Sequence, residues 1–384
     1  MTIKNEHNKI NVPNLRFPEF QGEWEESTIG EEFDLYSGNT PSRMNKEHFN
    51  GAINWISSGE LKEHYIADTK EKISDEAAKT LKMLPIGTFV IAIYGLEADG
   101  VRGTGSITKS ESTISQACMA FTSKGKVQNE FLYSWYKKHG NVIGIRYAQG
   151  TKQQNLSYDI IEKFKIAYPT FQEQEKLNKF IALLDERIAT QNKIIEDLKK
   201  LNAQIAERLF NGMNGNVVAL SEVCNILKGK QINGDCLSET GAYYVMNGGI
   251  EPSGYYDQCN TLANTISISE GGNSCGYVQY NKEAFWSGGH CYTLTDIQSD
   301  VCNLYLYHYL KSKESSIMKL RIGTGLPNIQ KKDLEKFNIL LPSIDDQNRV
   351  STFLTTIERK ITNEELLHSR FKEQKQYLLR QMFI

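Results

Sequence analysis

The chain has 384 residues, 40% of them hydrophobic and 23% charged, and this composition predicts a soluble globular protein of two or more domains. No run approaches the roughly 20 apolar residues that a membrane-spanning helix needs, and the polar N-terminus has no secretory signal. The net charge of −2 argues against a chain that binds nucleic acid through its own basic surface, because phosphate neutralisation normally requires an excess of Lys and Arg.

The cysteines give no sign of a disulfide framework. Their number is odd, and no two of them form a Cys-x-x-Cys pair. Reduced thiols in a cytoplasmic protein are therefore expected, with a zinc site as the alternative. The seven are Cys118, Cys224, Cys236, Cys259, Cys275, Cys291 and Cys302.

The first part of the chain is expected to be a flexible lead-in (residues 1–16) followed by a globular domain (residues 17–168). Short β-rich runs at 88–94 and 119–122 are bounded by Gly and Asn turns, and residues 132–138 have the pattern of a helix with an aromatic face. The pattern predicts a mixed α/β (α+β) domain.

Several polar loops of this domain have side chains suited to base edges and phosphates. Asn and Gln can read adenine through two hydrogen bonds, and Arg can read guanine. Taken singly, each of these residues is equally well explained as part of a solvated turn. The candidates are Asn39, Thr40, Arg43, Ser57, Ser58, Tyr94, Arg102, Thr151, Lys152, Gln153 and Gln154.

A long helix is predicted at residues 169–213. Pro169 stands where a proline is tolerated ahead of a helix, and Asn211-Gly212 is a typical helix end. Apolar residues recur at alternating spacings of three and four, as in a coiled coil. About 40 residues at 1.5 Å each would form a rod of roughly 60 Å. The seam reads Leu177, Ile181, Leu184, Ile188, Gln191, Ile195, Leu198, Asn202, Ile205 and Leu209.

A second globular domain is expected at residues 217–341, with β-rich runs at 265–269 and 292–295 and a helix at 304–310. Its candidate nucleic-acid contacts follow the same reasoning as those of the first domain. They are Lys228, Lys230, Gln231, Asn247, Tyr255, Asn273, Tyr277, His290, Arg321, Thr324 and Asn328.

Some residues of both domains have competing interpretations. The glycine-rich run 271–276 lacks a following Lys, so we expect loop geometry or a close approach to DNA, not a phosphate cradle. His290 is interpreted as a loop hydrogen-bonder instead of a catalytic base. Trp55, Trp135 and Trp286 are interpreted as core anchors and not as platforms for base stacking.

A second coiled-coil helix is predicted at residues 342–384, where the first helix pattern returns. The two helices are expected to pack antiparallel about a pseudo-two-fold axis. Its seam reads Val350, Leu354, Ile357, Ile361, Glu364, His368, Phe371, Lys375, Leu378 and Met382. Both seams carry polar residues at equivalent places, and polar seam residues fix register. Our hypothesis pairs Gln191 with Lys375 and Asn202 with Glu364.

The two halves are repeats of each other. The segment that starts at Asn155 aligns without a gap with the one that starts at Asn328, at an offset of 173 residues. The same offset pairs Pro169 with Pro342 and Gln174 with Gln347. A run this long at constant offset indicates duplication, with a variable globular region and a shared helical tail in each half.

Catalytic signatures are missing from both halves. The sequence contains no Gly-x-x-x-x-Gly-Lys-Ser/Thr loop, no His-Glu-x-x-His motif and no Pro-Pro pair of the kind that amino-methyltransferases carry. Neither globular region has a basic excess: residues 17–165 hold 17 Lys+Arg and 20 Asp+Glu, and residues 217–340 hold 10 and 12. A chain of this kind that bound DNA would need positive charge from a partner.

With these motifs in place, the whole chain resembles the specificity subunits of type I restriction-modification enzymes. The resemblance rests on the opening Val12-Pro-Asn-Leu-Arg-Phe-Pro-Glu-Phe20, on the duplicated Gly-Thr-x-x-x-Asn element at Gly150 and Gly323, and on the duplicated Pro-x-x-x-x-Gln turn at Pro169 and Pro342. A long helix follows each turn. The variable interiors carry the least resemblance.

The resemblance implies a DNA-recognition subunit without catalysis of its own. Residues 17–168 and 217–341 would be target-recognition domains, each reading one part of a bipartite DNA site whose gap is set by the helices. The implied partners are double-stranded DNA, two methyltransferase subunits, and restriction/translocase subunits. S-adenosylmethionine, ATP and Mg²⁺ would be bound by those partners and not by this chain, and the partners would supply the missing basic surface.

Two other functions remain open at this point. A free-standing nuclease would need an acidic-lysine constellation, and none recurs in register between the halves. A coiled-coil scaffold with two ligand-binding globular domains is compatible with the heptads alone. The Gly-Thr-x-x-x-Asn element, placed identically before each helix, favours the DNA-recognition subunit.

Overall fold

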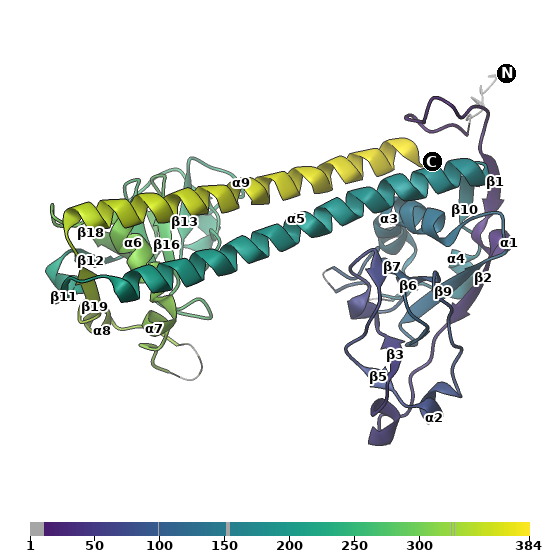
Figure 1. Cartoon of the computed structure of the whole chain (residues 1–384), viewed down its shortest axis with the longest axis horizontal. Coiled ribbons are helices and arrows are strands. Elements are labelled where there is room, and N and C mark those ends of the chain that lie inside the picture. The colour runs from purple at the N-terminus through teal and green to yellow at the C-terminus, as the bar shows by residue number, and fades with distance from the viewer. Residues whose placement is uncertain (1–10, 99, 151–153, 324, 326) are drawn as a thin grey trace. The chain divides into compact units, whose positions relative to one another are not determined.

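The computed structural model describes residues 11–98, 100–150, 154–323, 325 and 327–384 (Figure 1). The chain divides into two compact units: unit 1 contains residues 1–191 and 367–384, and unit 2 contains residues 192–366. The two long helices, α5 (Phe171–Gly212) and α9 (Ile344–Met382), each contribute residues to both units.

Unit 1 is built on a five-stranded sheet of order β2-β9-β6-β7-β4 and a three-stranded sheet of order β5-β3-β8. Strand β1 pairs separately with β10 and closes the domain next to α5. The buried residues of β6, β9 and helix α3 form one apolar core with the adjoining ends of the long helices. The elements are β1 (Glu25–Thr28), α1 (Ile29–Glu32), β2 (Phe33–Ser37), η1 (Lys46–Phe49), β3 (Ile53–Ile56), η2 (Ser58–Glu60), β4 (Tyr65–Ile66), β5 (Lys72–Ile73), α2 (Asp75–Ala78), β6 (Phe89–Ala92), β7 (Gly105–Thr108), β8 (Ser112–Ile114), β9 (Cys118–Ser123), α3 (Asn129–Tyr147), α4 (Tyr158–Ile161) and β10 (Lys165–Tyr168).

Unit 2 repeats this plan with a four-stranded sheet of order β12-β18-β15-β16 and a three-stranded sheet of order β14-β13-β17. Strand β11 pairs with β19 as β1 pairs with β10. The elements are β11 (Asn216–Ala219), η3 (Leu220–Glu222), β12 (Asn225–Lys228), η4 (Gly234–Cys236), β13 (Tyr243–Met246), β14 (Tyr255–Tyr256), β15 (Thr265–Ser269), β16 (Val278–Asn281), β17 (Trp286–Ser287), β18 (Cys291–Thr295), α6 (Asn303–Ser312), α7 (Glu314–Met318), α8 (Lys331–Glu335) and β19 (Asn338–Leu341).

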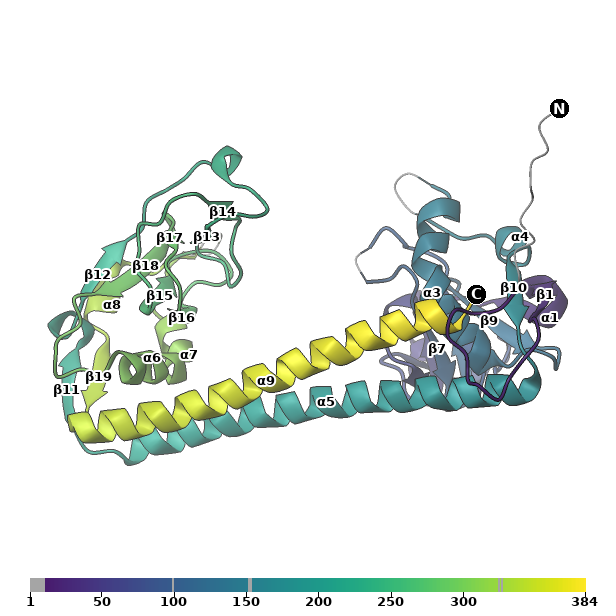
Figure 2. The same ribbon diagram turned by 90° about the horizontal axis from the view of Figure 1, so that it is seen from above.

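The duplication extends to individual hydrogen bonds. The strand order β2-β9-β6-β7 of unit 1 corresponds to β12-β18-β15-β16 of unit 2. Strands β12, β18, β15 and β16 are labelled in Figure 2. Leu156 N donates to Ile93 O in unit 1, and Ile329 N donates to Glu270 O in unit 2, both at 2.9 Å. The mixed α/β fold with an internal repeat is therefore confirmed, and Ile93 and Glu270 occupy the same place in the two units.

A buried glutamine fastens each domain to its long helix. In unit 1, Gln174 Oε1 accepts from Gln128 N at 2.9 Å, and its Nε2 donates to Lys126 O at 2.9 Å and Pro169 O at 3.0 Å. In unit 2, Gln347 Oε1 accepts from Cys302 N at 2.8 Å, and its Nε2 donates to the carbonyls of Asp300 and Pro342, both at 3.1 Å. Gln128 and Cys302 are the N-cap residues of α3 and α6, so each glutamine ties the start of a domain helix to the start of a long helix.

The long helices run antiparallel within each unit. In unit 1, Lys375 of α9 forms an ion pair with Asp185 of α5. In unit 2, Lys199 Nζ of α5 lies 2.6 Å from Glu365 Oε1 of α9. All twenty seam positions named from the sequence are buried or half-buried, as the three-four spacing requires.

The hypothesis about the polar seam pairs is wrong. Lys375 meets Asp185 and not Gln191, so the helices are displaced from the register that pairs the polar seam positions. Asn202 lines a hollow with Leu354 and Glu358, and its Oδ1 accepts no hydrogen bond from any described residue. In the observed register Lys375 pairs with Asp185, which follows the seam residue Leu184 in the sequence.

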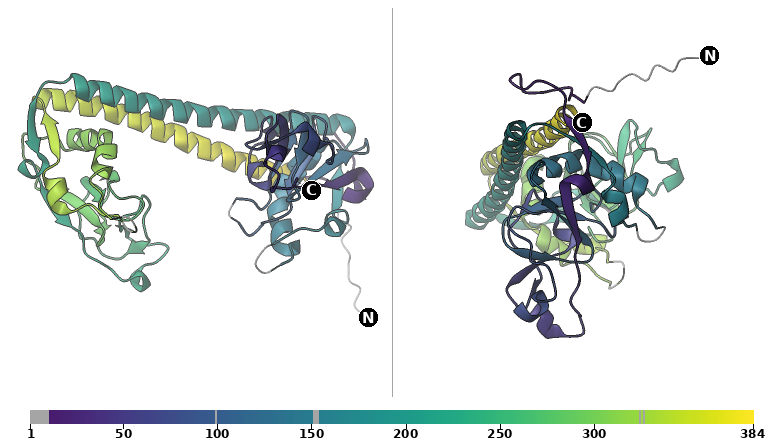
Figure 3. Two further views of the ribbon diagram at one scale, coloured as in Figure 1. Left: turned by 90° about the horizontal axis from the view of Figure 1, so that it is seen from below. Right: turned by 90° about the vertical axis from the view of Figure 1, so that its right-hand side faces the viewer.

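The lead-in is shorter than the sequence suggested. Residues 1–10 lie outside the described part of the chain, but residues 11–16 pack against unit 1 (Figure 3). Leu15 N donates to Gln381 O at 3.0 Å, and the Arg16 guanidinium donates twice to Glu173, at 2.7 Å each. A two-pronged bond to a buried carboxylate holds this segment in place. Among the described helices, none combines the length and the apolar character needed to cross a membrane.

Candidate nucleic-acid interface

In each unit, the candidate loops adjoin the ends of three neighbouring strands of the main sheet. In unit 1 these places are the end of β2, the end of β6 and the start of β9, which lie at one edge because the strands are antiparallel. Asn39 N donates to Ile114 O at 3.1 Å, and Tyr94 forms a bridge with Asn155. The corresponding edge of unit 2 is formed by the end of β12, the end of β15 and the start of β18.

One cluster at the edge of unit 1 joins Tyr94, Arg102 and Gln154. Arg102 Nη2 donates to Gln154 Oε1 at 2.9 Å, and Gln154 N donates to Glu97 Oε2 at 2.7 Å. This backbone hydrogen bond from Gln154 is the main reason that the pKa of Glu97 is lowered. The arginine lies over Gly144 of α3, where an added Cβ would come within 2.5 Å of Arg102 Cγ. The loops around residues 94–102 and 154 thus form one polar surface.

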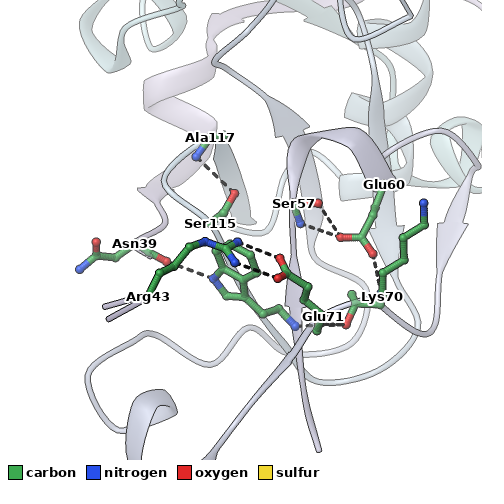
Figure 4. Close-up of polar contacts among 10 residues, drawn as sticks. Asn39, Arg43, Ser57, Glu60, Lys70, Glu71, Ser115 and Ala117 are labelled. Atoms are coloured by element: carbon green, nitrogen blue, oxygen red, sulfur yellow. Dashed lines mark hydrogen bonds and ion pairs between the residues drawn. The ribbon is translucent and has the colours of Figure 1, made fainter. Parts of the chain in front are cut away.

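A second cluster in unit 1 is centred on Arg43 (Figure 4). Its guanidinium donates to both oxygens of Glu71 at 2.9 Å each, and its Cζ lies 4.6 Å from the ring centre of Phe49. The hydrogen bonds from Arg43 lower the pKa of Glu71. Arg43 is a candidate for reading guanine, but both terminal nitrogens of its guanidinium already donate to Glu71. Contact with a base therefore requires that these hydrogen bonds to Glu71 break.

The serines of unit 1 shape a turn beside this cluster (Figure 4). Ser57 donates to Glu60 Oε2 from its backbone N at 3.0 Å and from Oγ at 2.7 Å. Lys70 N donates to the other oxygen, Oε1, at 2.7 Å. Ser58 begins the 3-10 helix η2 and is half-buried. These bonds make Ser57 part of the turn, which leaves Asn39 and Thr40 as the exposed and half-exposed polar residues of the neighbouring loop.

In unit 2 the candidate residues surround Glu270. Lys228 Nζ donates to Glu270 Oε1 at 2.5 Å, and His290 Nδ1 lies 3.5 Å from Oε2. Asn247 Oδ1 accepts from His290 N at 3.3 Å. Sequence reasoning did not select Glu270. Its one distinguishing sign is its position immediately after the β-rich run at 265–269.

Other candidates of unit 2 lie on the flanking loops. Asn328 bridges both Gly271 and Ile322, so the loop around it lies against the loop after β15. Lys230, Gln231, Asn273 and Arg321 are exposed. The glycine-rich run is a turn that packs closely on Met318, because a Cβ on Gly276 would lie 2.9 Å from Met318 Cγ. This packing agrees with the interpretation of loop geometry.

Two tyrosines of the candidate set lie away from Glu270, and four other candidates fall outside the described residues. Tyr255 belongs to β14 of the small sheet, where it pairs with Tyr244. Tyr277 stacks on Lys311, whose Nζ lies 3.9 Å from its ring centre. Neither contacts Glu270 in the recorded hydrogen bonds of the described chain. Thr151, Lys152, Gln153 and Thr324 lie outside the described residues.

Tryptophans support the edge loops from beneath. Trp55 and Trp135 are buried, and Trp286 is half-buried. Trp55 Nε1 donates to Asn39 O at 3.2 Å in unit 1, and Trp286 Nε1 donates to Lys230 O at 2.9 Å in unit 2. Asn39 and Lys230 hold the same place after the glycines Gly38 and Gly229. The two indoles, which come from different strands, therefore fix equivalent turns.

No metal site interrupts these surfaces: among the described residues, no group of three or more His, Cys, Asp or Glu side chains could hold an ion. All seven cysteines are free. Burial raises the pKa of the Cys118 and Cys224 thiols to about 12.

A protein with two copies of one mixed α/β domain, each fastened to a pair of antiparallel helices and each presenting polar loops at the same sheet edge, belongs to the class of duplicated recognition modules. Residues 21–200 and 214–369 match the type I restriction modification DNA specificity domain. The chain belongs to this family.

Relatives and solved structures agree with this assignment. A Mycoplasma pneumoniae protein, named provisionally as a type I specificity subunit, is 34% identical over 173 residues, which are 44% of this chain and 46% of the relative. The specificity subunit of type I restriction enzyme EcoR124I/EcoR124II from Escherichia coli is 28% identical over 202 residues, covering 51% and 48%. The matched regions span about half the length of these curated relatives.

The fold is also similar to that of solved S subunits. The S subunit of a type I restriction-modification system from M. genitalium matches with a TM-score of 0.66 at 19% identity, covering 97% of this chain and 99% of that one. A chain from a structural study of the assembly and conformational transition of the type I R-M system matches with a TM-score of 0.57 at 16% identity, covering 93% and 96%. At these identities the likeness concerns the fold.

Proposed function

We propose that this chain is the DNA sequence-recognition subunit of a type I restriction-modification complex. Residues 17–168 and 217–341 act as target-recognition domains, and each reads one part of a bipartite target. The subunit directs adenine methylation or restriction by partner subunits to that target.

The observation that carries the proposal is a duplicated frame with different side chains at the same edge. Equivalent backbone bonds hold Asn39 and Lys230, and Ile93 and Glu270, in matching places. A constant frame with variable polar loops can present two different sets of donors and acceptors to two DNA half-sites. A scaffold with a single ligand would have no need for this difference.

The chain has no catalytic role in this proposal. Two methyltransferase subunits and the restriction/translocase subunits bind S-adenosylmethionine, ATP and Mg²⁺, and this chain binds no cofactor. The partners also contribute the basic surface that the chain lacks. Two of the candidate cations, Arg43 and Lys228, are already paired with Glu71 and Glu270, so their charge is partly neutralised within the chain.

Sequencing of methylated adenines in the source strain, before and after deletion of this gene, tests the proposal. The expected result is that one split motif, two short parts around a fixed gap, loses its methylation. An unchanged set of methylated motifs, with the gene and its partners expressed, would contradict it and favour the scaffold. A purified chain that cuts DNA with Mg²⁺ alone would favour the nuclease.

A further inference from the structure

Glu270 is a buried carboxylate at the candidate edge of unit 2. It directly follows β15, and only 8% of the residue is exposed. Its backbone is fixed on both sides, because Glu270 N donates to His290 O and Ile329 N donates to Glu270 O, each at 2.9 Å. The carboxylate therefore has a defined position in the sheet frame.

The two oxygens of this carboxylate have different surroundings. Oε1 lies 2.5 Å from Lys228 Nζ and 3.1 Å from the hydroxyl of Tyr292. Oε2 is buried and accepts no hydrogen bond from any described residue. Leaving a buried acceptor without a hydrogen bond is unfavourable, so the site favours any donor that reaches it.

His290 is the side chain that can supply this donor. Its Nδ1 lies 3.5 Å from Oε2, and 61% of the side chain is exposed. Its backbone is held by Asn247, and it packs on Gly248, where a Cβ would lie 3.0 Å from His290 Cβ. Moving Nδ1–H a few tenths of an ångström closer would place it in hydrogen-bond contact with Oε2.

The side chains of Lys228, Glu270 and His290 have no counterparts in unit 1. Ile93 N donates to Ala117 O at 2.9 Å in unit 1, as Glu270 N donates to His290 O in unit 2. Ser37 is paired with Met119 at the place where Lys228 is paired with Tyr292. The frame is therefore built equally well with Ile93, Ala117 and Ser37, and the trio of Lys228, Glu270 and His290 is not a requirement of the fold.

Resting on the proposed function, we propose that Glu270 is a positioning residue that fixes the proton of His290 on Nδ1, so that Nε2 accepts a hydrogen bond from the exocyclic amino group of a base in one half-site. The nitrogen that carries the proton in a neutral imidazole is set by the hydrogen bond of the other nitrogen. In the major groove only adenine N6 and cytosine N4 present such amino groups, so the trio selects A or C at one position. Lys228 remains beside them as a cation near the DNA backbone.

The substitution Glu270→Gln tests this arrangement because it replaces one acceptor oxygen of the carboxylate with a donor NH2 group and keeps the shape of the side chain. Lys228 and Tyr292 both donate at the place of Oε1, so the amide oxygen takes that place. The amide nitrogen then faces His290 Nδ1 as a donor, and the proton of the ring moves to Nε2. The outward nitrogen changes from acceptor to donor and should prefer the carbonyl oxygen of G or T.

The first readout is the ¹⁵N chemical shift of the His290 ring in the purified full chain, assigned with His290→Asn. Wild type should show Nδ1–H and Glu270→Gln should show Nε2–H, with equal thermal unfolding.

The second readout is adenine methylation by the complete complex in the strain. Glu270→Gln should lower methylation of the original motif about tenfold and relax one position in a single half-site. Glu239→Gln, at an exposed residue, removes the same charge and should change neither readout.

The outcomes separate this inference from the proposed function. The same tautomer in wild type and Glu270→Gln, or an unchanged motif, overturns the role of Glu270 while the split motif of the wild type still supports DNA recognition. Relaxation in both half-sites also overturns it, because that result indicates general loss of structure. The absence of any split motif in the wild type contradicts the proposed function itself, and the tautomer measurement is unaffected.

Discussion

Two of the described histidines, His64 and His308, are buried, and their pKa values are shifted in opposite directions. His64 stacks between Tyr65 and Tyr133, with ring centres 4.0 Å apart on each side, and its nitrogens lie 2.8 Å from Glu130 and 2.9 Å from Asp185. Burial opposes its charge, but the bonds to Asp185 and Glu130 outweigh burial, and the pKa of His64 is raised from 6.5. His308 is buried beside Thr355 and Glu358, and burial lowers its pKa from 6.5 to about 4.

We expect the attachment of the unit 1 domain to its helices to weaken in mild alkali. A raised pKa means that the contribution of His64 is full below pH 6.5 and is lost as the pH rises through the folded value. Glu63, Lys137 and Lys375 also face this cluster. Burial lowers the pKa of Lys137 to about 8, and the loss of its buried charge above that pH acts in the opposite direction to the loss from His64. Hydrogen exchange of β4 and α3 peptides should rise between pH 6.5 and pH 9, after correction for intrinsic exchange. His64→Gln should remove this rise, and an identical rise in that variant would contradict the assignment.

The opposite dependence is expected in unit 2. Because the pKa of His308 is lowered, its neutral form stabilises the fold above pH 6.5, and this contribution is lost as the pH falls toward 4. The loss is on the order of 3 kcal/mol over that range. Exchange of α6 peptides should therefore increase below pH 6, while His308→Gln should show a flat profile. Equal acid sensitivity of the variant and the wild type would contradict the assignment to His308. Glu358 cannot account for such a loss, because burial raises its pKa and its protonation in acid stabilises the fold.

At the scale of elements, the two glutamine fasteners should be equivalent. Gln174→Ala and Gln347→Ala each remove three hydrogen bonds and leave an N-cap amide and two carbonyls without partners. Each should lower the free energy of unfolding by about 2–4 kcal/mol, measured by denaturant titration. Gln174→Glu keeps the acceptor for Gln128 N but sets a buried carboxylate oxygen against the carbonyls of Lys126 and Pro169, so it should lose at least as much. A cost below about 0.5 kcal/mol for either alanine variant would show that the fasteners are not structural.

The long helices should set the distance between the two half-sites. Seven residues inserted in both helices, after Gln191 and after Leu366, add about 10.5 Å and keep the heptad pattern, and this is close to the rise of three base pairs. The methylated motif should then have a gap about three base pairs longer, with both half-sites unchanged. Four residues inserted at the same places break the seam and should abolish methylation. A longer helix pair with the original gap would contradict the rod model.

The elements were predictable where a short-range period defines them. The three-four spacing identified every seam residue, and the constant offset identified the duplication, since both depend on sequence alone. The pairing of Lys375 was not predictable, because a one-dimensional pattern does not reveal that Asp185, beside the seam, offers a better partner than Gln191. The candidate loops were found because they carry side chains suited to base edges and phosphates. Their position at one edge of each sheet comes from the structure. Glu71 and Glu270 were missed because a paired acid has no sequence pattern that separates it from an exposed one.

At the scale of the whole molecule, the account explains the absence of a basic excess. The candidate cations Arg43 and Lys228 are paired within the chain, and the remaining surface is close to neutral. The isolated chain should therefore bind duplex DNA weakly, and its affinity should rise by at least tenfold when the methyltransferase subunits are added at the same salt concentration. Tight, sequence-specific binding by the chain alone would contradict the assignment of the basic surface to the partners.

The central claim is that each domain reads its own half of one split target. The most direct test replaces residues 17–165 with the corresponding segment of a family member that has a different methylated motif, and maps methylated adenines in the strain that carries the chimera. The account predicts that one half of the motif changes to that of the donor, while the other half and the gap stay the same. A motif that changes in both halves, or in neither, with the chimera expressed and assembled, would contradict it.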